Sequence, residues 1–147
     1  MYRFKSYPYI LPLLLVSLLA FSGCASEEEQ PTSLALIGTY DDDWGSTHEI
    51  TADSWTISWS TGGSAVYHVI SYDNAAGQVL TQNDVNNDYF PEMYSRFDWA
   101  EVDTKLYYCQ TVYAADTVAA AEGVPAADSA DLATGCGGFP WTGLIAK

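Results

Sequence analysis

Residues 84–88 contain the spacing of oxygen-bearing side chains that most resembles a metal site in this sequence. Asp84, Asn86 and Asp88 stand at positions 1, 3 and 5, the spacing of a calcium-binding loop. However, Tyr89 follows where the turn of an EF-hand requires glycine, and Ser95 stands where that loop needs a bidentate glutamate. The segment therefore predicts a hairpin turn rich in Asn and Asp, with a calcium site of another type as the alternative.

Arg96 is the only arginine after residue 23, and it lies between aromatic residues in the segment YSRFDW. Strand residues two positions apart share a face, so Arg96 and Asp98 would lie side by side. We expect a partly buried, hydrogen-bonded ion pair that fixes packing. A clamp for a ligand carboxylate is the sharper alternative.

Few residues are spaced for catalysis. His48 and Glu49 are neighbours on a predicted strand, so they face opposite sides and do not form a zinc site together. The sequence contains no HExxH, CxxC or GxSxG motif and no glycine loop of the kind that cradles phosphate. We therefore expect a non-catalytic protein. The alternative is a hydrolase, for which Asp98 and Glu101 are the best carboxylate candidates.

Aromatic side chains are the remaining chemical resource, because five Trp and eight Tyr follow residue 23. Many must fill the core, and others are available to line a cavity or to stack on sugars. The candidate ligand-binding residues are Tyr40, Trp55, Trp59, Arg96 and Trp99, and an internal cavity would add Tyr67 and Tyr108.

The candidate residues lie in short segments that are rich in Val, Ile, Thr, Tyr and Trp. Clusters of Gly, Asn and Asp separate these segments, as turns separate strands. In one of them, Trp55, Ile57 and Trp59 alternate with polar residues, as in a strand with one buried face. Strands are predicted at 34–40, 46–51, 54–60, 64–72, 77–83, 92–99 and 104–113, with a weaker candidate at 139–145.

This pattern predicts an all-β fold, a small antiparallel β-barrel of seven to eight strands, with a β-sandwich as the alternative. The run near 116–122 breaks the pattern and predicts one short helix, which Asp116 can cap and Gly123 can end. Residues 123–138 are rich in Ala, Asp and Gly, which indicates a long connection.

The N-terminus has the layout of an export signal. Arg3 and Lys5 precede an apolar run from Ile10 to Phe21, which is shorter than the roughly 20 residues of a membrane-spanning helix. The segment FSGC at 21–24 resembles the bacterial lipobox, although Phe21 departs from the usual Leu. The resemblance implies that residues 1–23 are a lipoprotein signal peptide and that Cys24 is the first mature residue, bearing diacylglycerol and often a further fatty acid such as palmitate.

A lipid-anchored protein of the cell envelope is the resulting expectation. Two acyl chains suffice for stable anchoring, so the membrane partner is reached through the lipid on Cys24. Ala25 and Ser26 follow where an Asp would signal retention at the inner membrane, which favours the outer membrane. Residues 24–33 read as an acidic disordered tether, of a kind also found in lipoproteins exposed at the surface. Residues 34–147 then form a single β domain.

Charge narrows the partners further. The chain after residue 23 has 19 acidic and three basic residues, a formal net charge of −16. Nucleic acid would be repelled and is excluded as a partner.

Lipidation of Cys24 leaves Cys109 and Cys136, and two thiols outside the inner membrane are usually paired. We therefore predict a structural Cys109–Cys136 disulfide that stabilises the fold by about 3 kcal/mol.

The segment LIGTY at 36–40, followed by an acidic turn, resembles the opening of small lipocalin-like lipoproteins, which have Trp where Tyr40 stands. That resemblance implies that Tyr40 plugs the base of the barrel and that Arg96 packs on it.

The first functional expectation is a non-catalytic lipoprotein that binds a small, partly apolar ligand in the interior or mouth of its barrel. The second is a surface interaction or structural module that recognises polysaccharide or a protein through exposed Trp and acidic loops. No cofactor is expected, apart from the calcium alternative at Asp84.

Overall fold

A computed structural model describes residues 33–147 of the chain. The predicted signal peptide at 1–23, Cys24 and nearly all of the predicted tether at 24–33 lie outside the described residues. Within residues 33–147, no helix is both long and apolar enough to cross a membrane.

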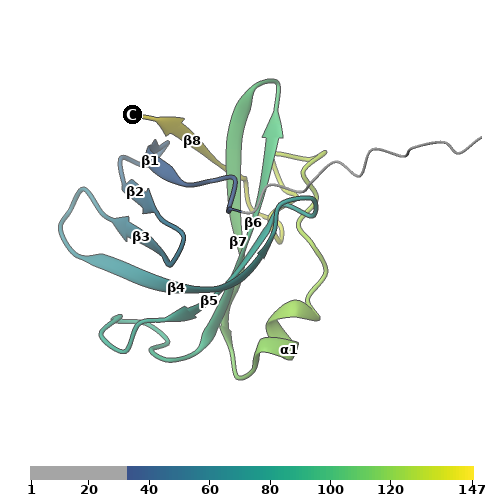
Figure 1. The fold of residues 1–147 in the computed structure, drawn as a ribbon. Coiled ribbons are helices and arrows are strands. Elements are labelled where there is room, and N and C mark those ends of the chain that lie inside the picture. The colour runs from purple at the N-terminus through teal and green to yellow at the C-terminus, as the bar shows by residue number, and fades with distance from the viewer. Residues whose placement is uncertain (1–32) are drawn as a thin grey trace, which may run out of the picture.

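Eight antiparallel strands close into a barrel in which each strand pairs with its neighbours along the chain and β8 pairs with β1 (Figure 1). The strands are β1 (Gly38–Asp42), β2 (Thr47–Ile50), β3 (Ser54–Ser58), β4 (Ser64–Asp73), β5 (Gln78–Asn83), β6 (Tyr94–Val102), β7 (Lys105–Ala115) and β8 (Thr142–Ala146). The predicted all-β barrel is confirmed, and the chain does not form the sandwich given as the alternative.

The first strand is the clearest difference from the predicted boundaries. Strand β1 begins at Gly38, four residues later than expected. Leu34 and Leu36 alternate like strand residues, but both are buried beneath one end of the barrel, where they belong to the core cluster. The side chain of Asn74 holds this segment by accepting from the Ala35 N–H and donating to the Ser33 carbonyl.

Aromatic rings fill the barrel interior. Trp55 is fully buried and stacks on Phe97, with their ring centroids 4.5 Å apart. Tyr67 meets the edge of Phe97, and Tyr108 packs against both Trp55 and Phe97. The centre of the barrel is therefore a packed core of aromatic side chains.

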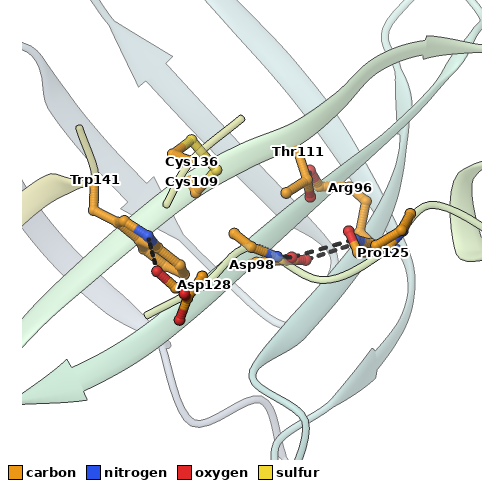
Figure 2. The surroundings of a disulfide bond; sticks show 9 residues. Arg96, Asp98, Cys109, Thr111, Pro125, Asp128, Cys136 and Trp141 are labelled. Atoms are coloured by element: carbon orange, nitrogen blue, oxygen red, sulfur yellow. Dashed lines mark hydrogen bonds and ion pairs between the residues drawn. A yellow bond between two sulfur atoms is a disulfide. The ribbon is translucent and has the colours of Figure 1, made fainter. Parts of the chain in front are cut away.

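The segment that connects β7 to β8, residues 116–141, crosses the outer face of β6 and β7 (Figure 1). We call this segment the strap. It starts with helix α1 (Val118–Glu122), which confirms the predicted helix. Thr117, rather than Asp116, is the N-cap, because its hydroxyl accepts from the Ala120 N–H. The predicted disulfide between Cys109 and Cys136 is present and ties the strap to β7 (Figure 2).

Arg96 lies between β6 and the strap and donates hydrogen bonds to the strap. Its Nε and Nη2 donate to the two carboxylate oxygens of Asp98, at 2.8 and 3.2 Å (Figure 2). Its Nη1 donates to the carbonyls of Ala121 and Val124, and its Nη2 also donates to the Pro125 carbonyl. The predicted ion pair is present and 2% of Arg96 is exposed, so its donors are committed to the protein.

Two expectations for Arg96 are therefore corrected. It is not placed to clamp a ligand carboxylate, because Asp98 and the strap carbonyls take up its donors. It also does not pack on Tyr40, because it faces the strap outside the barrel while Tyr40 belongs to the interior cluster. Tyr40 instead donates its hydroxyl to the carbonyl of Leu36.

The barrel has two ends that differ in character. The entry end carries the β2–β3, β4–β5 and β6–β7 turns, and the described chain starts there, beside Asn74. The distal end carries the β1–β2 turn, the β3–β4 and β5–β6 loops, and the end of β7.

Candidate functional site

Exposed aromatic residues gather at the distal end. Seven aromatic side chains of the described chain are strongly exposed, and Tyr72 is the only one near the entry end. The other six belong to the distal turns, to the end of β7 or to the chain leading into β8, and are Trp44, Trp59, Tyr89, Phe90, Tyr113 and Phe139. Because exposed apolar surface that is gathered in one region often marks an interaction site, we take the distal end as the candidate site.

The β1–β2 turn holds Trp44 in solvent. The buried carboxylate of Asp42 accepts hydrogen bonds from the backbone N–H groups of Trp44 and Ser46, at 2.9 and 2.7 Å. Gly45 completes the turn with a φ of 81°, a conformation that favours glycine. The result is a fixed turn that leaves 74% of Trp44 exposed.

A buried polar chain anchors this turn to the core. Nε2 of His48 lies 3.1 Å from the other carboxylate oxygen of Asp42, and Nδ1 of His48 accepts the indole N–H of Trp55 at 3.0 Å. His48 is completely buried, and that burial lowers its pKa. A neutral His48 with its proton on Nε2 therefore links the centre of the core to the rim that carries Trp44.

A tight turn places Phe139. Cys136 and Phe139 exchange two backbone hydrogen bonds, at 3.1 and 2.9 Å, across Gly137 and Gly138. Both glycines have positive φ, 61° and 92°, as the central residues of a type I′ turn require. With Cys136 fixed to Cys109 by the disulfide, the turn holds Phe139 beside β7 with 72% of it exposed.

The length of β7 creates a gap beside these residues. Strand β8 pairs with β7 only from Leu106 to Tyr108, whereas β7 continues to Ala115. On that side, the last part of β7 faces the chain that leads into β8. Tyr113 lies on this overhang and is 55% exposed.

An open pocket of about 350 Å³ lies in this gap, and we call it the mouth pocket. It is bounded by the β1–β2 turn, the overhang of β7 and the segment that enters β8. Its lining residues are Trp44, Tyr108, Cys109, Gln110, Tyr113, Cys136, Phe139, Pro140 and Thr142. Aromatic rings from three separate segments therefore meet around one hollow.

A second open pocket, of about 500 Å³, continues along the strap. It shares five residues with the mouth pocket, including Tyr113, Phe139 and both cysteines of the disulfide. The two hollows adjoin, and the Cys109–Cys136 disulfide forms part of the wall of each. The strap therefore contributes lining residues to both pockets in addition to covering β6 and β7.

Polar groups at the inner edge of the mouth pocket are few and neutral. Burial raises the pKa of the Tyr108 hydroxyl, and the charge of nearby Asp42 raises it further. Burial also raises the pKa of Tyr113. Tyr108, Gln110 and Thr142 are thus neutral polar groups beside the aromatic rings, and they already bond within the barrel, with Gln110 donating to Ser95 and Tyr108 bonded to Thr142.

The residues predicted to bind a ligand do not converge. Tyr40 and Trp55 are buried in the core, Trp59 lies on the β3–β4 loop, and Trp99 is half-buried near the entry end. These four do not line the mouth pocket or the pocket along the strap, and Arg96 lines a different one, beside α1. Ligand binding by these residues stays a prediction, and we take the mouth pocket as the candidate site because exposed rings line it.

The acidic loop at 84–88 folds as a turn. One carboxylate oxygen of Asp84 accepts from the backbone and side-chain amides of Asn86, and the other lies 2.7 Å from Nε2 of His68. These contacts lower the pKa of Asp84. Across residues 33–147, no three His, Cys, Asp or Glu side chains are grouped to hold a metal ion. Calcium binding by Asp84, Asn86 and Asp88 stays a prediction.

Within residues 33–147 there are two histidine–carboxylate pairs, and neither lines one of these pockets. The pair of His48 and Asp42 is sealed in the core, and the pair of His68 and Asp84 lies on the outer surface. The hydrolase alternative predicts two carboxylates or a histidine–carboxylate pair that converge in one pocket. Asp73 and Glu122 both line the pocket beside α1. This alternative stays a prediction.

Sequence reasoning missed Tyr113 and Phe139 as site residues. The glycine pair before Phe139 was an available signal for a tight turn, and Cys136 beside it indicated a fixed position. Nothing in the sequence around Tyr113 revealed that β7 would extend past β8.

In comparisons with protein-family models, with curated proteins and with solved structures, no match to this chain was found.

Proposed function

We propose that this chain is a lipid-anchored, non-catalytic binding protein of the cell envelope whose mouth pocket binds a small, partly apolar ligand. Outer-membrane location, with the barrel facing the aqueous surroundings, is part of the proposal. The observation that carries it is the meeting of Trp44, Tyr113 and Phe139 around one open pocket.

The energetics of exposed aromatics support a binding role. Trp44 and Phe139 are 74% and 72% exposed although rigid turns hold both of them in place. Each ring that a ligand covers removes apolar surface from water, at about 25 cal/mol per Å². Because hydrogen bonds already order the backbone of both turns, binding does not have to order that backbone.

The position of the site relative to the proposed anchor is also favourable. The lipid on Cys24 would reach the barrel through residues 24–33, and Ser33 is bonded to Asn74 at the entry end. The mouth pocket lies at the other end. An anchored barrel can therefore present the pocket away from the membrane surface.

Recognition of a polysaccharide or a protein partner is the second candidate. It is favoured by the further aromatics Tyr89 and Phe90, which are 74% and 48% exposed on the β5–β6 loop of the same end. A larger partner would cover this loop together with the mouth pocket, whereas a small ligand would leave it in solvent.

The anchor can be tested separately from the binding site. Expression in a bacterial host followed by mass analysis should give a mature chain that starts at Cys24 and carries the mass of a diacylglyceryl group. Cys24→Ala should leave the chain unlipidated. A wild-type chain with an unmodified cysteine would contradict the anchor and leave the binding proposal standing.

The binding site can be tested with neutral probes. Indole and cyclohexanol, titrated into the isotope-labelled full chain, should shift the Trp44 indole N–H signal and the amides of Tyr113 and Phe139. Phe139→Ala should abolish the response, and Tyr89→Ala, which removes an equally exposed ring outside the pocket, should preserve it. Shifts confined to the β5–β6 loop would favour the second candidate, and no shift at any distal residue would contradict the proposed function.

A further inference from the structure

The charge of the distal end indicates which ligands the mouth pocket can accept. Residues 33–147 contain 16 acidic residues and three basic ones. Five acids belong to the distal turns and to the end of β7, namely Asp43, Asp84, Asp88, Glu92 and Asp116. Four of the five are exposed, and Asp84 is partly buried.

None of the three bases of the described chain lines the mouth pocket. Lys105, which starts β7, lines an outer pocket that Asp43 also lines, and the ammonium group of Lys147 lies 2.9 Å from Asp41. Arg96 is buried, and Asp98 pairs with it. The mouth pocket therefore combines exposed aromatic rings with a lining that contains no lysine or arginine, and the nearby distal turns carry an excess of acidic residues.

The aromatic rings and the acidic residues both favour a cationic ligand. The face of an aromatic ring attracts a cation, most strongly for Trp, and several rings around one hollow add their effects. An anionic ligand would meet repulsion from the acids and no basic side chain at the rim. A neutral ligand would gain only from the burial of its apolar surface.

We infer that the mouth pocket selects organic ammonium ions, compounds whose positive nitrogen is surrounded by apolar groups. This inference rests on the proposed function and adds the ligand class. In the bound state the ammonium group lies among the rings of Trp44, Tyr113 and Phe139, and the distal acids raise its local concentration without contacting it.

Choline and its carbon isostere 3,3-dimethylbutan-1-ol provide a matched pair of probes, because they have nearly the same shape and differ in charge. Each is titrated into the full chain in a non-ionic detergent, with sodium chloride replaced by choline chloride so that ionic strength stays constant. The signal is the indole N–H of Trp44, which is assigned by its disappearance in Trp44→Phe.

Choline should bind saturably and at least about fivefold more tightly than the isostere. Phe139→Ala should weaken choline binding by a similar factor, and Tyr89→Ala should leave it unchanged. Asp116→Asn, which removes an exposed distal charge, should reduce choline affinity slightly and leave the affinity of the isostere unaltered. Glu101→Gln, near the entry end, is the matched charge control and should affect neither probe.

The outcomes separate this inference from the function on which it rests. If the isostere binds at the mouth as tightly as choline, the inference is overturned and the proposed function stands. If choline binding is equally strong in Phe139→Ala, the cation is held by surface charge alone and the inference is overturned. If neither probe, nor indole or cyclohexanol, shifts the signal of Trp44, both are overturned.

Discussion

Trp55 donates its indole N–H to Nδ1 of His48 at 3.0 Å, and both residues are completely buried. Because an indole nitrogen can only donate, this contact requires Nδ1 to be unprotonated. The remaining proton is on Nε2, which points at the carboxylate of Asp42. One hydrogen bond in the core thus fixes the tautomer of a histidine and, through Asp42, the turn that presents Trp44.

The first prediction concerns pH. Burial lowers the pKa of His48 below its ordinary value of 6.5, so the unfolded chain takes up a proton before the folded barrel does. The free energy of unfolding should therefore fall as pH drops below 6.5, until the lowered pKa of the folded state is reached. Denaturant titrations between pH 7.5 and 5 measure this. His48→Gln should flatten the dependence, and an unchanged slope in that variant would show that another group is responsible.

The second prediction separates two tryptophans by the same substitution. Trp55→Phe leaves Nδ1 of His48 without a donor, which costs about 1–3 kcal/mol, and it also leaves space in the core. Trp44→Phe should change the free energy of unfolding by less than about 0.5 kcal/mol, because the ring is largely in solvent. Urea denaturation of both variants makes the comparison. Equal losses would mean that the hydrogen bond between Trp55 and His48 contributes little.

The third prediction concerns the ion pair beneath the strap. Asp98→Asn keeps the size of the side chain but leaves the guanidinium of Arg96 buried without its counter-charge, which should cost about 3–5 kcal/mol. Lys147→Gln removes an ion pair whose side chains are both about half exposed, so its effect on stability should be undetectable. Comparable effects from the two substitutions in urea denaturation would contradict the buried geometry of Arg96.

The fourth prediction concerns the disulfide, which closes a sequence separation of 27 residues. Replacing Cys109 and Cys136 together by alanine should lower the free energy of unfolding by about 3 kcal/mol. Hydrogen exchange should accelerate in the strap and at the Cys136–Phe139 turn. The amides of β3 and β4 should keep their protection, because these two strands pair only with β2, with each other and with β5, whereas the disulfide joins the strap to β7. Uniform acceleration over the barrel would show that the disulfide supports the whole fold and not the strap.

The sequence predicted the fold well because the signals were local. The alternation around Trp55 predicts a strand, and the turns rich in glycine and asparagine predict where strands end. Closure of the sheet into a barrel is then expected, because a closed barrel has no exposed edge strands. The start of β1 was misplaced because Leu34 and Leu36 have the spacing of a strand. Only the closed barrel shows that these two side chains plug an end, held there by Asn74.

The candidate site was harder to predict, since it depends on which side of the barrel each ring faces. Trp44 and Trp55 look alike in sequence, yet one is 74% exposed and the other is completely buried. The exposure of Trp44 follows from its place in a turn, which the acidic run before it did indicate. The contribution of Phe139 depends on a disulfide and on the unequal lengths of β7 and β8, which involve residues far apart in the chain.

Native mass spectrometry of the full chain purified from its own host tests the central proposal most directly. We predict that the wild-type chain carries the mass of a small molecule in addition to polypeptide and lipid. That mass should be absent after Trp44→Ala combined with Phe139→Ala and present after Tyr89→Ala. A wild-type chain with no added mass, or an added mass that survives loss of both mouth rings, would contradict binding at the mouth pocket.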